Sequence, residues 1–203
     1  MSGSRRTVSL VEVALGFKPH TGWAVAVTIG GDATAPVVFD RRRVTLCPDD
    51  LPRQVYHHAQ GLSPARAVRS VVDVEDAVDI TSTLVLGELA ERAAAHGELV
   101  AVGIVGEPRD VPDLKQVLTS HALLHLAEGE LYRGALDDAA HERGLTVSLM
   151  SHKGTVEQAS AALGVSAGAL TATLTGLRRE LGAPWQADHR DAAAAALVAL
   201  ALR

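Results

Sequence analysis

A run of seven apolar residues, LVAVGIV at positions 99–105, constrains the fold of this chain more than any other feature. The run shows no alternation of apolar and polar residues, so the strand it predicts is buried on both faces of a sheet. One long helical pattern precedes it and another follows it, and a second buried strand is predicted for LTVSLM at 145–150. Helices that alternate with buried strands indicate a sheet covered by helices.

Three further strand patterns come first, at Thr7–Phe17, Trp23–Ile29 and Val37–Leu46. The stretches between them, KPHTG and GGDATAP, are short and rich in turn-forming residues. Connections of this kind fit antiparallel hairpins. The first part of the chain is therefore predicted to form a three-strand meander.

The helices are predicted from their end signals. Ser63-Pro64 supplies a cap and a first-turn proline for a helix that ends at Gly97, while Val, Ile and Thr in its middle lower the helix propensity and leave a break near 74–80 open. A second helix is predicted from Asp113 to Arg143 and is closed by Gly144. Two short helices over 155–181 and a last helix from Asp188 to the C-terminus follow.

Length and composition favour one domain over residues 1–203. The 203 residues are 47% hydrophobic, which suffices for one core, and no apolar run reaches the roughly 18 residues of a membrane span. The single Cys47 and the lack of a signal-peptide pattern predict a cytoplasmic protein with no membrane partner. The net charge of −5 means that binding to nucleic acid requires a local basic patch, and the strand period divides the run Arg41–Arg43 between two faces.

The order of elements, three strands and then alternating helices and strands, resembles that of the RNase H-like fold, which includes the RuvC-type resolvases. The resemblance implies an α/β fold: a mixed sheet, made of a three-strand antiparallel meander plus two further strands, with helices covering it. The segment at about 155–182 is then a helical-hairpin insertion. The resemblance also implies two divalent cations held between carboxylates of the first strand, the fourth strand and the last helix.

Those three places can be compared residue by residue. The first-strand frame, GFKPHTGW, has Lys18 where the family has an aspartate, whereas Glu107 in VGEP matches the second acid. Asp188 and Asp191, in DHRDAAAAAL, resemble the third. An ammonium group repels a cation, so we interpret the acidic centre as degenerate and ordinary two-metal nuclease activity as unfavoured. Structural roles for these acids stay open as alternatives to a catalytic one. Asp188 and Asp191 could cap the last helix, and Glu107 could face solvent or pair with Lys18.

The stretch SHALLHLAEGELYR, at 120–133, carries His121, His125 and Glu128 on one apolar stripe of a predicted helix. Such groups need partners, because burying an unpaired charge costs several kcal/mol. They could form a polar network that fixes helix docking, serve a non-metal functional pocket, or bind a metal ion through the two histidines and the glutamate. The network is favoured, since histidine pairs on helices are more often structural. The stretch also resembles uncharacterised bacterial proteins of similar size that end like Pro184–Ala192, a resemblance that implies no activity.

The segment 155–182 also resembles a helix-turn-helix, with Gly164-Val165-Ser166 at the turn. Its second helix offers no residue that reads base edges before Arg178 and Arg179. A helical hairpin that caps the sheet is therefore favoured over a DNA-reading module.

Together these patterns predict one polar cleft at the ends of the strands. Its substrate, by analogy with the fold, is a nucleic acid or another phosphate-containing molecule. The rivals are a non-catalytic scaffold or interaction protein, expected as a homodimer, and a metal-dependent hydrolase that uses His121, His125 and Glu128. The sequence leaves open the cofactor, with a divalent metal as one option, and whether the chain is an enzyme. The candidate cleft residues are Lys18, His20, Glu107, His121, His125, Glu128, Asp188 and Asp191.

Overall fold

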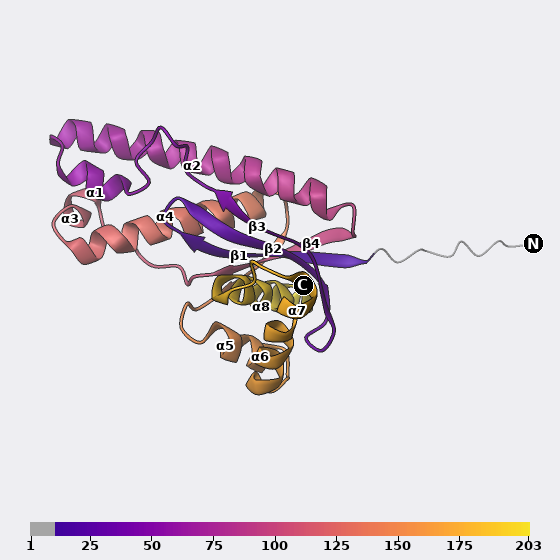
Figure 1. Cartoon of the computed structure of the whole chain (residues 1–203). Helices are drawn as coiled ribbons and strands as arrows, with labels where there is room; N and C mark the ends of the chain where they lie inside the picture. The colour runs from indigo at the N-terminus through magenta and orange to yellow at the C-terminus, as the bar shows by residue number, and fades with distance from the viewer. Residues whose placement is uncertain (1–10) are drawn as a thin grey trace, which may run out of the picture.

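A five-stranded sheet forms the centre of the molecule in a computed structural model that describes residues 11–203 (Figure 1). The strand order is β3-β2-β1-β4-β5. The first three strands pair antiparallel, whereas β4 runs parallel to β1 and β5 runs parallel to β4. The predicted meander with two further strands is confirmed. The strands are β1 (Glu12–His20), β2 (Trp23–Gly31), β3 (Pro36–Thr45), β4 (Glu98–Val105) and β5 (Thr146–Met150).

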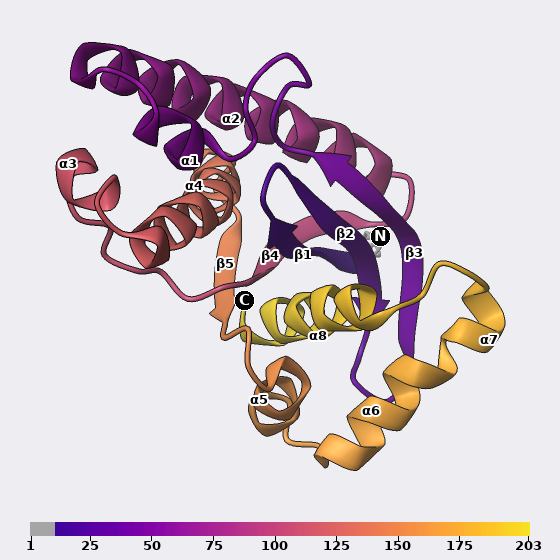
Figure 2. The same cartoon turned by 60° about the vertical axis from the view of Figure 1, so that its left-hand side comes forward.

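Helices cover both faces of the sheet (Figures 1 and 2). One face carries α1 (Val55–Gln60), α2 (Pro64–Ala93), α3 (Leu114–Val117) and α4 (His121–Glu142). The other face carries α8 (Ala187–Leu202), with α5 (Thr155–Ala162), α6 (Ala167–Gly176) and α7 (Arg178–Leu181) outside it. Each face therefore has its own apolar core.

Alternation along β1 decides which side chains meet which helix layer. Leu15 and Phe17 point into the core beneath α2 and α4, whereas Ala14 points into the core beneath α8. Because successive side chains in a strand alternate between faces, Lys18 and His20 share the α8 face. This register brings the polar end of β1 to the start of α8.

The last helix lies unusually close to the sheet. A Cβ atom added at Gly16 of β1 would overlap the carbonyl oxygen of Ala192, and one at Gly103 of β4 would overlap that of Ala195. The alanines of α8 at 192–196 are all fully buried. Small residues on both sides of this interface let the backbones approach, which fixes where the first turn of α8 lies.

The continuity of the two long helices differs from the sequence expectations. The break near 74–80 that the sequence left open is absent, because Val71, Val74 and Val78 are buried on one face of α2 and their packing overrides the weak helix propensity of valine. The predicted helix 113–143 is instead interrupted at 118–120, where the Thr119 hydroxyl donates to the Gln116 carbonyl and Ser120 is extended. Hydroxyl side chains that bond the local backbone favour such helix ends. Residues 7–10 of the predicted first strand lie outside the described residues.

The 155–182 segment consists of two helical arms, α5 and α6–α7, that meet at a sharp bend. The axis of α5 and the axis of the α6–α7 segment differ in direction by 113°. Ala159 of α5, together with Leu170 and Leu174 of α6, belongs to the core beneath α8. Among residues 11–203, no single helix is long and apolar enough to cross a membrane, while this bent pair passes on length and composition alone.

Candidate functional site

Lys18 is the centre of a polar cluster at the carboxyl end of β1. Its ammonium nitrogen lies 3.1 Å from Oδ2 of Asp191, which is one turn into α8. The Lys18 side chain is 10% exposed and that of Asp191 is 24% exposed, so water screens this ion pair only partly. Lys18 therefore connects the central strand to the helix that packs on it.

His152 is the second partner of Lys18. It lies two residues past Met150, the end of β5, and its Nδ1 atom is 3.3 Å from the Lys18 ammonium nitrogen. Partial burial and the nearby positive charges of Lys18, Arg109 and His20 lower the pKa of His152 below its usual value. A neutral His152 can accept a hydrogen bond at Nδ1, which agrees with the ammonium group donating to it.

His20 lies beside this pair and makes its own contacts. Its Nε2 atom is 2.9 Å from Oδ2 of Asp188, at the start of α8. Its ring stacks on Trp23 with 4.1 Å between ring centroids, and the Arg43 guanidinium lies 3.9 Å above the Trp23 ring. His20 is thus held between an acid and an aromatic ring.

This set of residues does not fit a pair of divalent cations. Two hard cations need several carboxylate oxygens around a common space. Here an ammonium group contacts Asp191, and Asp188 is paired with His20. In this conformation both helix carboxylates already have cationic or hydrogen-bonding partners.

Glu107 does not take part in the Lys18 contacts, because the acid paired with Lys18 is Asp191. It is exposed and lines a pocket of about 180 Å³ between the end of β4 and α4. Arg109, His125 and His152 line the same pocket. The pocket therefore places one histidine of the α4 stretch beside residues that follow β4 and β5, although Lys18 and His20 do not line it.

The three residues from SHALLHLAEGELYR differ in their surroundings. Glu128 is 1% exposed, but His121 and His125 are exposed at the edge of the helix layer. The prediction that all three face the protein interior was therefore wrong for the histidines. The two histidines lie in the first turns of α4, which begins at His121 after the helix break at 118–120, whereas Glu128 lies further along the same helix, where it is buried.

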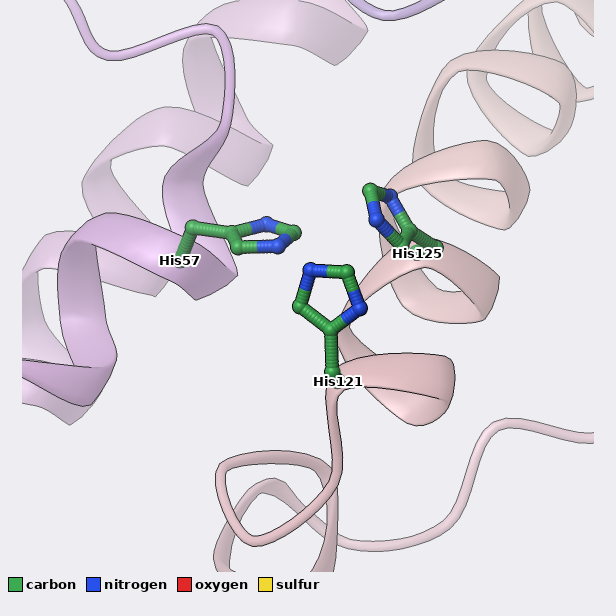
Figure 3. A group of neighbouring side chains, drawn as sticks. All are labelled: His57, His121 and His125. Atoms are coloured by element: carbon green, nitrogen blue, oxygen red, sulfur yellow. The ribbon is translucent and has the colours of Figure 1, made fainter.

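Glu128 has a partner that the sequence did not reveal. Its Oε1 atom lies 2.8 Å from Nδ1 of His57 in α1, and its Oε2 atom lies 4.0 Å from Nδ1 of His125. The imidazole rings of His57, His121 and His125 point toward one another (Figure 3). Nitrogen atoms of the three rings all lie within 4.8 Å of one another, a spacing compatible with holding a metal ion.

Two site residues, His57 and His152, were therefore missed. His152 lies just past the predicted strand at 145–150, as Glu107 lies just past the strand at 99–105, and it could have been found in that way. The strand itself, β5, is an edge strand in which only Met150 is buried, so the prediction that it is buried was wrong. His57 belongs to α1, a six-residue helix that none of the sequence patterns above predicted, and only the folded chain brings it to α4.

The arginine run makes structural contacts. Arg41 donates to the backbone carbonyls of Pro184 and Leu181, and Arg42 pairs with Asp40 and Glu88. With Arg43 stacked on Trp23, each of the three guanidinium groups has a protein partner. Within the run, Arg42 is the residue whose charge is balanced by acidic partners.

Comparison with known proteins identifies the fold. No protein-family model matches the sequence, and no curated protein matches it. T. thermophilus RuvC in complex with a Holliday junction substrate is 17% identical with a TM-score of 0.52, over 92% of this chain and 91% of that one. A second Thermus thermophilus RuvC structure gives 16% identity and a TM-score of 0.49 over the same shares. The chain has the RNase H-like fold of RuvC, and at this identity the likeness concerns the fold alone.

Proposed function

We propose that this protein is an RNase H-like domain that binds the phosphate backbone of a nucleic acid at the carboxyl ends of β1, β4 and β5, without two-metal hydrolysis. One observation carries the proposal: the Lys18 ammonium, nearly buried, lies 3.1 Å from Asp191. In the RNase H-like nucleases a carboxylate at the matching position of the first strand holds cations. An ammonium group at that position disfavours a cation, and because Asp191 balances its charge, the exposed cations nearby supply the attraction for phosphate.

Exposed cations near His152, the second partner of Lys18, support an anionic ligand. Arg109 and Lys153 are exposed, and Arg109 lines the pocket that also contains His152. Glu107 and Glu130 line the same pocket, so the local charge is mixed. Few phosphates can therefore be neutralised, and binding is expected to be weak and local, in keeping with the net charge of −5.

The fold supports nucleic acid over a small phosphate ester. The RuvC structure described above has a Holliday junction as its substrate. We extend that class of ligand to this chain by analogy with its fold, and we extend no cleavage activity. The homodimer expected from the sequence remains a prediction, which sedimentation velocity of the purified chain tests.

The test is fluorescence anisotropy with a labelled four-way DNA junction and a duplex built from its arms. If Arg109 and Lys153 neutralise about two phosphates, the plot of log affinity against log salt should have a slope of about −2. Arg109→Ala with Lys153→Ala should remove most of the binding. With Mg²⁺ present, the junction should stay intact.

The matched control is Arg178→Ala with Arg179→Ala, which removes the same charge from exposed positions of α7. Affinity should be unchanged in this variant. If it falls there instead, the helix-turn-helix-like segment is the binding surface and the proposed site is wrong. An absence of binding at low salt would favour the scaffold alternative, and Mg²⁺-dependent cleavage lost in Asp191→Asn would refute the modified centre.

A further inference from the structure

Three imidazole rings from two helices converge at the edge of the α1–α4 layer. The ring centroid of His57 lies 5.2 Å from that of His121 and 4.7 Å from that of His125. The centroids of His121 and His125 are 4.4 Å apart. Figure 3 shows His57 on α1 facing His121 and His125 on α4. This cluster plays no part in the Lys18 contacts described above.

The fold places these rings for identifiable reasons. His121 and His125 are four residues apart, so they lie on the same side of α4. Two hydroxyl groups fix the region of α1: Tyr56 donates to Glu75 of α2 at 2.6 Å, and Tyr132 of α4 donates to the Arg53 carbonyl at 2.7 Å. His57 is thereby held opposite the two α4 histidines.

Glu128 orients His57. Its Oε1 atom is 2.8 Å from Nδ1 of His57 and 3.4 Å from the backbone nitrogen of the same residue. A carboxylate that accepts from Nδ1–H leaves the lone pair of Nε2 free on the other side of the ring. This carboxylate–histidine arrangement is the one that holds metal-binding imidazoles in place in many proteins.

The second oxygen of Glu128 points to a ligand. Glu128 is 1% exposed, and within residues 11–203 its Oε2 atom has no hydrogen-bond partner. A buried carboxylate oxygen without a partner is costly. If Glu128 and the histidines formed a complete polar network, a donor would bond the Oε2 atom of Glu128. A nearby cation would instead balance the charge of this carboxylate. Nδ1 of His125, 4.0 Å away, could donate to Oε2 once Nε2 of that ring binds a metal.

The donors select the class of metal. Imidazole nitrogens suit zinc and other borderline transition ions rather than Mg²⁺ or Ca²⁺. Tetrahedral zinc with bonds of about 2.0 Å needs nitrogen atoms about 3.3 Å apart, so the rings must move inward by roughly 1 Å from spacings of up to 4.8 Å. His121 and His125 are exposed, which leaves their side chains room for that movement.

We infer that His57, His121 and His125 bind one Zn²⁺ ion and that Glu128 is a positioning residue for His57. The assignment differs both from the polar network that the sequence favoured and from its metal alternative, in which Glu128 itself bound the metal. Three protein ligands leave a fourth position open, and the exposure of the cluster gives that position to water. The inference does not rest on the proposed nucleic-acid binding.

The experiment is a titration of the tag-free, chelator-treated chain with ZnCl₂ by isothermal calorimetry, with thermal unfolding in parallel. One equivalent should bind, and the melting temperature should rise with zinc concentration. Glu128→Gln should weaken zinc binding by about 10- to 100-fold, and His121→Ala or His125→Ala should weaken it further. Co²⁺ bound in place of zinc should show the visible absorption of a four-coordinate ion.

His58→Ala is the matched control, since it removes an exposed histidine from the neighbouring position of α1. It should bind zinc like the unaltered chain. The His121 and His125 variants alter exposed side chains and should fold, which circular dichroism of the metal-free proteins checks. Uptake of less than one equivalent by the unaltered chain, or equal losses in the His58 and His121 variants, would overturn the inference.

Discussion

Replacing Lys18 with methionine tests the contact on which the strand-end cluster depends. The change keeps most of the side-chain length and removes the charge, so Asp191 loses its partner at 3.1 Å. At an effective dielectric constant of 20, two unit charges at that distance attract by about 5 kcal/mol, before the cost of removing them from water. Asp191 is 24% exposed and can be partly rehydrated, so the net loss should lie near 2 kcal/mol, between surface and fully buried pairs.

In a chain of this length, a loss of about 2 kcal/mol should lower the melting temperature by about 4–8 °C. Differential scanning calorimetry at neutral pH measures the change. Lys115→Met, at an exposed position of α3, is the control and should shift the melting temperature by less than about 1 °C.

The double variant Lys18→Met with Asp191→Asn separates the ion pair from simple packing. If the cost comes from leaving a charge without its partner, removing both charges should recover part of the stability, with a coupling of about 1 kcal/mol or more. Strictly additive losses would refute the ion pair as the source. A Lys18→Met variant as stable as the control would refute the cluster itself.

Three further predictions follow from the same structure. The pKa of His152 is lower in the folded chain than its unfolded value near 6.5. Its contribution to stability should therefore be lost as the pH falls below about 6.5 toward the folded pKa. The melting temperature of His152→Gln should depend less on pH over that window. Gly16→Ala should destabilise the protein by more than about 3 kcal/mol in chemical unfolding, because the new Cβ would overlap the Ala192 carbonyl. Gly134→Ala, with open space around it in α4, should stabilise the protein by about 0.5–1 kcal/mol. Equal effects of the two changes would contradict the close packing of α8. Lys18→Asp should gain calorimetric Mn²⁺ binding that Lys18→Met does not show, and identical titrations would mean that Lys18 is not what keeps cations out.

The fold could be predicted from the sequence because it depends on local patterns that agree with one another. The continuous apolar run at 99–105 became β4, and the turn-rich stretches between the first strand patterns became the connections of a meander. The interior of α2 was misread because its valines pack on the core, a tertiary effect that outweighs their propensity. Local patterns therefore gave the elements, while packing decided where helices continued or stopped.

The candidate site was harder to predict, since its partners come from distant parts of the chain. Lys18, Asp188 and Asp191 were found because a known frame pointed to their positions. His57 contacts Glu128 across 71 residues, and His152 contacts Lys18 across 134. No periodicity connects such pairs, and a histidine in a short helix has no pattern that distinguishes it from a surface residue.

The Lys18 cluster and the histidine cluster are expected to respond in opposite ways to a metal ion, so each can be tested separately. At the strand ends the Lys18 ammonium repels metal ions, whereas the imidazole cluster around buried Glu128 attracts one. A pocket that His125 and His152 both line lies between the two centres. Zinc binding should therefore be unchanged in Lys18→Met, and any Mn²⁺ site created by Lys18→Asp should survive in His121→Ala. If removing one centre abolishes metal binding at the other, the two form a single site and the separate assignments are wrong.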